Sequence, residues 1–262
     1  MKNLSIKKIG EELARAGRLS YRPLCVHGTS QTPSGSAPTT AISFCVAEAI
    51  FALAADSTIP ALYVGGDGLK NCCGGGTSYL GFTRRSSYIK YFVSYGTKEF
   101  RNGAAEYLRA TPKLVEENAR SVGKITPPGK YVVVRPCSDL DDKDPGVRSI
   151  LLFGEAENIR NLCSLVHFRS ANAFKGILAP SGPSCASFIT YAAGMAAKGP
   201  KDAAIIGPFD PTGNCWFPPN LLSLALPIKM ARRMCDDLPQ TFLKKRMHIA
   251  FPEKRSSIEL PK

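Results

Sequence analysis

The stretch that decides the fold is KYVVVRPCSDLDDKDPGVRSILLFGE, residues Lys130–Glu155. It contains two runs of β-branched and other apolar residues, which predict strands over Lys130–Leu140 and Arg148–Glu155. The polar segment DLDDKDPG (Asp139–Gly146) between them predicts a turn. The next segment, Ala156–Phe168, has the apolar periodicity of a helix. Such alternation of strands and helices predicts an α/β or α+β protein with a mixed sheet.

The same patterns predict the other elements. Strands are expected over Pro23–Gly28, Pro60–Gly66, Ile89–Gly96 and Ala203–Pro208. Helices are expected over residues 1–20, Thr39–Asp56 with Thr39 or Thr40 as its cap, Asn102–Val122 with an interruption at Pro112, and Ala179–Gly199 with Ser184 as its cap. Phe209–Asn220 is expected to be a loop, and Leu221–Leu238 to start extended and turn helical near Pro227. No linker is long enough to enforce a boundary, so residues 1–262 are expected to form a single domain.

The composition is that of a folded domain. The chain has 262 residues, of which 44% are hydrophobic and 21% charged, and this balance excludes a disordered protein. No run of eighteen apolar residues is present, so no membrane-spanning helix is expected. The N-terminal residues have neither the apolar core nor the cleavage site of a signal peptide. We therefore expect a cytoplasmic protein that has no membrane partner.

The net charge is +13, but the basic residues are dispersed. The densest basic runs are Lys244–His248 and Glu253–Ser257. No zinc finger, winged helix or mixed aromatic and basic module is recognisable, so a solvated basic surface is favoured over a nucleic-acid interface.

Two twelve-residue segments resemble each other: ALYVGGDGLKNC (Ala61–Cys72) and AIIGPFDPTGNC (Ala204–Cys215). Each begins as a buried strand and ends Asp-x-x-x-Asn-Cys. A predicted helix with a cysteine near its first turn, Cys45 or Cys185, precedes each segment. The sequence therefore suggests two pseudo-related halves, residues 21–125 and 126–247, packed as one globular unit.

This repeat predicts a site for four thiolates. Cys45, Cys185, Cys215 and one of Cys72 and Cys73 would meet where strands return the chain to helix N-termini, whose positive ends lower the pKa of thiols. Four cysteines suit an iron–sulfur cluster or a zinc ion. The absence of C-x₂-C pairs favours a cluster, of the [4Fe–4S] type, over zinc. The alternative is that the nine cysteines are core residues.

Other residues are assigned to the same site. Gly74 and Gly75 would let backbone N–H groups approach inorganic sulfide, and Trp216 would shield a cluster from water. A second hypothesis is a non-redox protein that binds a small molecule or an anion. In it, the glycine-rich turns, His27 and the segment SGPS, which ends at Ser184, would form the pocket.

Several stretches, taken in order, resemble the uncharacterised domain-of-unknown-function 169 family of bacteria and archaea. They are RPLCVHG, FCVAEAIFALA, CCGGGTSYLGF, GKYVVVRPCSDL, ILLFGEAENIRNL, PSCASFITYAAG and GNCWF followed by LALPIKM, and they span Arg22–Leu238. The resemblance implies cysteines at Cys45, Cys73, Cys185 and Cys215, whereas Cys25 and Cys137 do not match. It implies no activity.

The leading hypothesis is an iron–sulfur protein with a redox role, either electron transfer or reduction of a small substrate. Its partner would be a redox protein or a small molecule, and a homo-oligomer is compatible with the sequence. The repeat aligns Cys72 with Cys215, whereas the family resemblance aligns Cys73 with the expected ligand. Because neighbouring side chains diverge, only one of the two is expected to face the centre.

Overall fold

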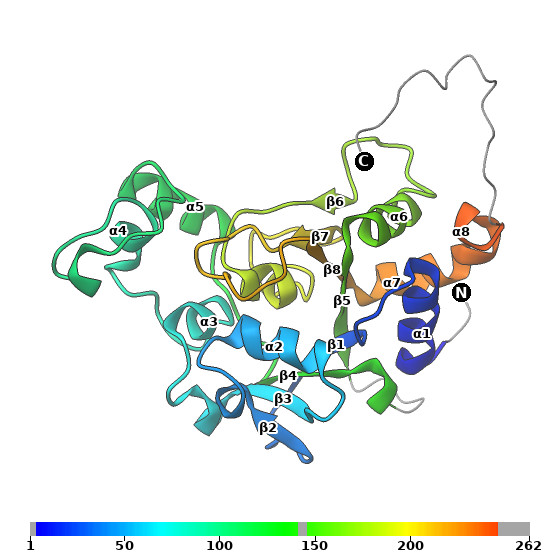
Figure 1. Cartoon of the computed structure of the whole chain (residues 1–262), viewed down its shortest axis with the longest axis horizontal. Coiled ribbons are helices and arrows are strands. Elements are labelled where there is room, and N and C mark those ends of the chain that lie inside the picture. Colours follow the sequence, from blue (N-terminus) through cyan, green and yellow to red (C-terminus); the bar gives the residue numbers. More distant parts are fainter. Residues whose placement is uncertain (1–3, 141–145, 246–262) are drawn as a thin grey trace.

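The computed structural model describes residues 4–140 and 146–245, and within them it has one mixed sheet with helices on both faces (Figure 1). The strands are β1 (Leu24–Thr29), β2 (Ser36–Pro38), β3 (Ala61–Gly65), β4 (Tyr131–Pro136), β5 (Val147–Glu155), β6 (Ile177–Leu178), β7 (Ala204–Gly207) and β8 (Leu221–Pro227). The helices are α1 (Ile6–Gly17), α2 (Val46–Ala55), α3 (Gly74–Tyr79), α4 (Ile89–Val93), α5 (Pro112–Val122), α6 (Ala156–Val166), α7 (Ile228–Asp237) and α8 (Phe242–Lys245). The predicted α/β class with a mixed sheet is confirmed.

The strand order is β2-β3-β4-β1-β5-β8-β7-β6. Read inward from its edge, each half has the same order: β2-β3-β4-β1 on one side corresponds to β6-β7-β8-β5 on the other. The antiparallel pair β1–β5 forms the centre, with Leu24 opposite Leu151. On one side, the pairs β1–β4 and β4–β3 are antiparallel and the edge pair β3–β2 is parallel. On the other side, the pairs β5–β8 and β8–β7 are antiparallel and the edge pair β7–β6 is parallel. The strands thus divide into β1–β4 and β5–β8, and the division falls between Pro136 and Val147. A boundary at residue 125 would place β4 with the second set.

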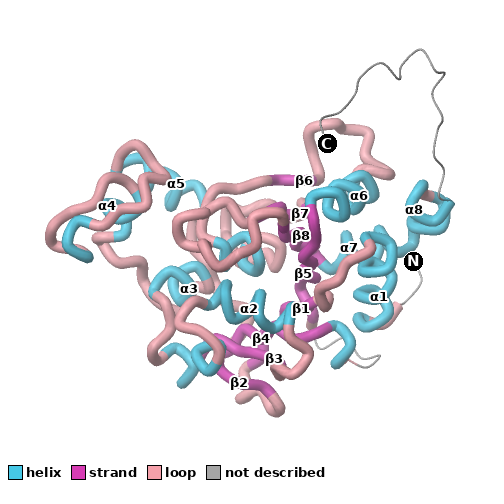
Figure 2. The backbone as a smooth tube through the Cα atoms, in the orientation of Figure 1, coloured by secondary structure: helices cyan, strands magenta, loops and turns pink. Residues whose placement is uncertain are grey.

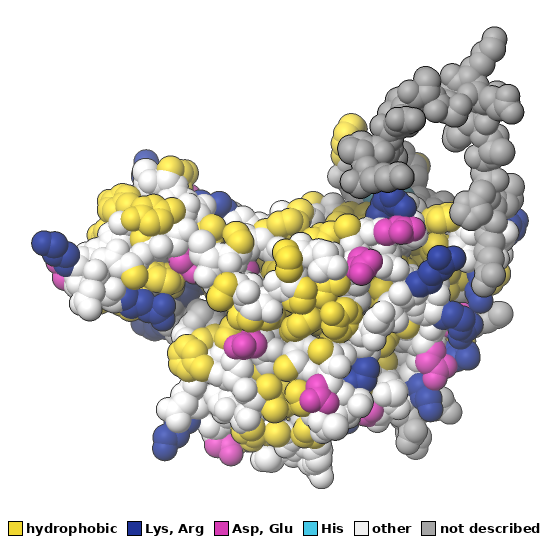
Figure 3. Space-filling model, in the orientation of Figure 1, with side chains coloured by type: hydrophobic (Ala, Val, Ile, Leu, Met, Phe, Trp, Pro, Cys, Tyr) yellow, Lys and Arg dark blue, Asp and Glu magenta, His cyan; other side chains and the backbone are white. Residues whose placement is uncertain are grey.

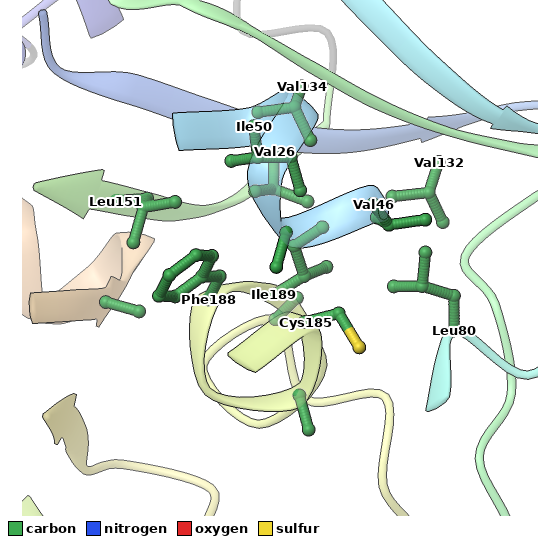
Figure 4. Close-up of a cluster of buried hydrophobic side chains, with 14 of the residues drawn as sticks. Val26, Val46, Ile50, Leu80, Val132, Val134, Leu151, Cys185, Phe188 and Ile189 are labelled. Atoms are coloured by element: carbon green, nitrogen blue, oxygen red, sulfur yellow. The ribbon is translucent and has the colours of Figure 1, made fainter. Parts of the chain in front are cut away.

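Apolar side chains cover both faces of the sheet. On one face α1, α6 and α7 bury a cluster that includes Ile9 and Ile150. On the other face, α2 and a one-turn π-helix at Ala186–Thr190 bury a cluster that includes Leu151 and Phe188 (Figures 1 and 4). Double coverage explains why β5 is a continuous apolar run rather than an alternating one.

Several predicted elements begin or end elsewhere. The helix expected from Thr39 starts at Val46, because Thr39–Ala41 form a separate 3₁₀ turn and Cys45 is the N-cap residue. The helix expected over Ala179–Gly199 is limited to one turn around Ser184–Thr190. In the second segment, the Ser184 hydroxyl donates to Asp210 and the Thr190 hydroxyl donates to the Tyr79 carbonyl, so these polar groups bond to distant parts of the chain.

The segment between Thr83 and Val122 differs most from expectation. Ile89–Val93 is the short helix α4 rather than a strand. Asn102–Thr111 contains no α-helix, and Pro112 begins α5 at a position where a missing N–H costs nothing. Helices α4 and α5 pack on each other as an arm that stands away from the sheet (Figures 1 and 2). Because α4 lies away from the sheet, its apolar residues pack against α5 instead of joining the sheet as a strand.

Among the described residues, no helix is both long enough and apolar enough to cross a bilayer. The predicted turn Asp139–Gly146 and the basic run Lys244–His248 lie partly outside the described residues, and the run Glu253–Ser257 lies wholly outside them.

Candidate functional site

The sheet separates the cysteines into two groups. Cys45, Cys72, Cys73 and Cys185 belong to the core on the α2 face. Cys25, Cys137, Cys163 and Cys235 belong to the core beneath α1, α6 and α7. All nine cysteines lie in the described residues and are free thiols, and Cys215 is the exposed one.

Cys73 is the centre of the first group. Its sulfur accepts hydrogen bonds from the thiols of Cys45 and Cys72 and from the backbone N–H of Val46 and of Gly76, the last at 3.3 Å. Val46 is the first residue of α2, and Gly76 lies in the first turn of α3. Two helix N-termini therefore meet at one sulfur atom, where their unpaired N–H groups stabilise negative charge.

These contacts determine which thiol of the group ionises. The hydrogen bonds from Cys45 and Cys72 lower the pKa of Cys73 far below its ordinary value. Donating to Cys73, together with burial, raises the pKa of Cys45 and the pKa of Cys72. The group therefore carries its first negative charge on Cys73.

Cys185 belongs to the same neighbourhood. It is the N-cap of the π-helical turn and is 4% exposed. Its sulfur points away from Phe188, toward the side where Val46 and Leu80 lie (Figure 4). Burial raises the pKa of Cys185, and the negative charge of Cys73 raises it further. Cys45, Cys72 and Cys73 belong to the chain segment that holds β1–β4, and Cys185 belongs to the segment that holds β5–β8. Cysteines from both segments thus converge on this face of the sheet.

Cys215 is separate from this group. It lies exposed in the loop between β7 and β8.

Asp210, at the start of the same loop, is held in place by Ser184. The Asp210 carboxylate accepts hydrogen bonds from the Ser184 N–H at 3.0 Å and from the Ser184 hydroxyl at 2.5 Å. The expected role of Ser184 as a helix cap is therefore replaced by donation to Asp210.

The structure places both Cys72 and Cys73 toward the same centre, contrary to the expectation that only one would face it. Asn71, with a φ of 62°, bends the chain just before the pair, and Cys73 is the N-cap of α3. This turn, rather than a regular strand or helix, lets adjacent side chains converge. The repeat is unequal here, since Asn71 is exposed while its counterpart Asn214 is buried and bonds to Asp210.

The three glycines after the pair differ. A Cβ on Gly76 would lie 2.5 Å from Val46 Cγ2 and 2.9 Å from Cys73 Sγ. A Cβ on Gly74 or Gly75 would meet nothing within 4 Å. Close approach of the two helix N-termini thus depends on Gly76, while Gly74 and Gly75 border open space.

Trp216 packs against aromatic rings, with centroid separations of 5.9 Å to Phe51 and 5.7 Å to Phe217. Its indole Nε1 is buried without a hydrogen-bond partner among the described residues. Trp216 therefore contributes to the aromatic part of the core on the α2 face.

A cavity of about 670 Å³ opens beside Cys73. Its inner wall comprises residues of α3 (Cys73–Gly75, Ser78 and Tyr79), the segment Ser181–Pro183 and Phe209–Asp210. The arm α4–α5 and the chain around it form the outer wall. The surface is indented between this arm and the rest of the molecule (Figure 3). Cys73, Gly74 and Gly75 line this cavity as expected of a site, whereas Ser184, Trp216 and His27 do not.

Sequence reasoning missed the basic side chains of the cavity. Arg84, Arg85, Lys90, Arg101 and Arg109 line it, together with the acidic side chains of Glu106, Glu116 and Asp210. The available signal was the pair Arg84–Arg85, which follows the glycine-rich segment directly in the sequence. The other three basic residues are spread over twenty positions and meet only through the fold of the arm.

Within the described residues, no group of three or more histidine, cysteine, aspartate or glutamate side chains is arranged to hold a single metal ion. The thiols of Cys45 and Cys72 instead each donate a hydrogen bond to Cys73. A cluster is larger than an ion and would take the place of these contacts by separating the sulfur atoms. The donor set, cysteine sulfur alone, is the set that iron–sulfur clusters use.

The fold and the site together define an α/β protein with a symmetric mixed sheet, a cysteine group on one face and a basic cavity beside it. The family model of DUF169, an uncharacterised ArCR family, matches residues 12–237, and the chain belongs to that family. No curated protein and no solved structure matches the chain.

Proposed function

We propose that this chain is an iron–sulfur protein with a redox role, and that Cys45, Cys72, Cys73 and Cys185 hold the cluster. The observation that carries the proposal is the convergence of these cysteines where two backbone N–H groups already point at one sulfur. Cys72 takes the place that the sequence suggested for Cys215, because Cys72 contacts Cys73 while Cys215 is exposed.

The local electrostatics suit such a centre. Cluster ligands are thiolates, and the hydrogen bonds from Val46 and Gly76 stabilise a thiolate at Cys73. N–H···S hydrogen bonds also tune the reduction potential of a cluster. When bound, the cluster would supply one-electron transfer. The nine free thiols are consistent with the reducing cytoplasm that we propose as the location.

The cavity favours one of the two redox roles. Cys73 lines a space large enough for a small molecule, so a substrate could lie directly against the proposed centre. A protein that only passes electrons to another protein needs no such cavity. We therefore propose that the cluster takes electrons from a redox partner protein and passes them to a small substrate, which is reduced, rather than serving electron transfer alone.

The test is iron and acid-labile sulfide analysis of protein purified without oxygen. We expect iron and sulfide in equal amounts, and visible charge-transfer absorbance that is lost in Cys73→Ser and Cys185→Ser. Cys163→Ser is the matched control, because Cys163 lies on the opposite face of the sheet. Cys215→Ser should retain the cluster, whereas Cys72→Ser should lose most of it.

Two outcomes would contradict the proposal. Zinc without sulfide would establish a structural metal site instead. Absence of both metal and sulfide, after reconstitution with iron and sulfide under reducing conditions, would leave the cysteines as core residues.

A further inference from the structure

Two arginines contact the inner wall of the cavity beside Cys73. Arg85 lies over the ring of Tyr79 at 4.4 Å, and Arg109 donates to the Leu108 carbonyl at 3.0 Å and to the Ser181 hydroxyl. Both arginines act on Tyr79, since their charges lower its pKa against the larger effect of burial. Arg85 and Arg109 therefore lie near the same part of the wall.

Neither arginine is paired with a carboxylate in the part of the chain that the structure describes. Lys90, by contrast, forms a 2.6 Å ion pair with Glu116. Among the described residues, no ion pair joins Arg85 or Arg109 to an acidic side chain, although both are partly buried. Partly buried guanidinium groups are costly unless an anion compensates them.

The acidic groups of the cavity do not supply that compensation. Asp210 is engaged by Ser184, and burial raises its pKa. Burial also raises the pKa of Glu106, and the charge of Asp210 raises it further. Both carboxyl groups thus carry their charge less readily than exposed ones, whereas the arginines remain fully charged.

Apolar side chains also line the cavity, beside these charged and polar ones. Phe44, Phe92, Val93 and Phe209 line it, and Phe44 is 60% exposed. A volume of about 670 Å³ lies within the range of small-molecule sites. Two unpaired guanidinium groups and an aromatic wall would recognise a molecule that has one anionic end and an apolar body.

We propose that the cavity binds a small organic anion, a carboxylate or phosphate ester with an apolar body, whose anionic group is held by Arg85 and Arg109. The inference rests on the proposed function only in naming this anion as the substrate of the cysteine centre, since Cys73 lines the same cavity. Binding itself needs no cluster, so it is tested on protein without iron.

The probe is 8-anilinonaphthalene-1-sulfonate, an aromatic anion, and its uncharged partner is N-phenyl-1-naphthylamine, which has the same rings without the sulfonate. Both report binding by fluorescence. For Arg85→Gln/Arg109→Gln we expect the Kd of the anion to rise by about tenfold per arginine, the loss of one charge-assisted hydrogen bond each, with the Kd of the uncharged dye unchanged. Arg160→Gln, a change on the exposed surface of α6, should alter neither Kd.

A second variant locates the dyes in the cavity. At Gly75, which lines the cavity, an added Cβ meets nothing within 4 Å, so Gly75→Phe should place a ring in the cavity and weaken the binding of both dyes. Thermal unfolding by circular dichroism verifies that each variant is folded, and Arg85→Lys/Arg109→Lys, which keeps the charge, should recover part of the affinity. Equal binding of the anion by the wild type and the double glutamine variant would overturn the proposal. So would dye binding that Gly75→Phe leaves unchanged, or failure of the wild type to bind the anion.

Discussion

Gly76 shows at the scale of one residue why the sequence reads CCGGG. Its missing side chain lets Val46, at the start of α2, approach Cys73, at the start of α3. Gly74 and Gly75 do not have this role, because both border open space. A run of three identical residues thus contains one position that packing requires and two that face the cavity.

We predict that Gly76→Ala separates the two helix N-termini and displaces the Cys73 sulfur. Overlap of this kind in a packed site typically costs about 1–3 kcal/mol. The iron content of the anaerobically purified protein should fall several-fold, and urea unfolding should show the loss of stability. Gly75→Ala is the control and should change neither. Normal iron content in Gly76→Ala would show that the close approach is unnecessary.

The two cysteines before these glycines also show that the local turn determines where neighbouring side chains point. The internal repeat aligns Cys72 with Cys215, and the family resemblance favours Cys73, yet the turn at Asn71 brings both side chains to one centre. The physical reason is that the divergence of neighbouring side chains holds for regular strands and helices. It does not hold across an N-cap.

At the scale of elements, the segment Ala104–Arg109 contributes Glu106, Leu108 and Arg109 to the lining of the cavity. It hydrogen-bonds along the end of α4, from the Glu106 N–H to the Phe92 carbonyl at 2.8 Å and from the Leu108 N–H to the Val93 carbonyl at 3.0 Å. This pairing puts the Glu106 side chain into the cavity near Asp210. The sequence predicts that this segment is helical, but its backbone hydrogen-bond partners lie in α4. Hydrogen bonds between separate segments are not revealed by the periodicity of the sequence.

We predict that Glu106→Gln stabilises the protein at neutral and alkaline pH. Burial, and then the charge of Asp210, raise the pKa of Glu106 above its ordinary value of 4.5. The folded chain therefore binds this proton more tightly than the unfolded chain, and stability falls as the pH rises through the raised pKa. Removing the charge should abolish that fall, so the advantage of the variant should be largest near pH 8 and vanish near pH 4.

Urea unfolding at both pH values measures this difference. Glu117→Gln is the control, since Glu117 lies exposed on α5, 4.0 Å from Lys113, and should show no comparable pH dependence. A Glu106→Gln variant that is less stable than the wild type at pH 8 would contradict the argument, because its carboxylate would then be stabilising.

At the scale of the whole molecule, the sheet makes the two sets of strands one unit. Phe153 on β5 is fully buried, and its ring lies 5.1 Å from Phe188 and 5.3 Å from Phe51. Phe51 belongs to α2, in the chain segment that holds β1–β4. A single core therefore spans the division at β1 and β5.

We predict that Phe153→Ala lowers the free energy of unfolding by about 3–5 kcal/mol, the usual cost of truncating a buried aromatic ring. One transition should remain, with the same midpoint by circular dichroism and by the fluorescence of Trp216, because the core is continuous. Phe174→Ala, at a side chain that is 93% exposed, should change stability by less than about 0.5 kcal/mol. Two separate transitions would show instead that the sets of strands unfold independently.

The local sequence pattern was sufficient to predict the apolar strands β1, β3, β4, β5, β7 and β8 and the helices α1, α6 and α7. Burial of one or both faces of an element gives its sequence a characteristic spacing of apolar residues. Family membership and the candidate cysteines Cys45, Cys73 and Cys185 were also readable. Tertiary structure alone decided the symmetric strand order, the contact of Cys72 with Cys73 while Cys215 is exposed, and the basic cavity. Each of these depends on contacts between segments far apart in the chain, and neither periodicity nor spacing carries that information.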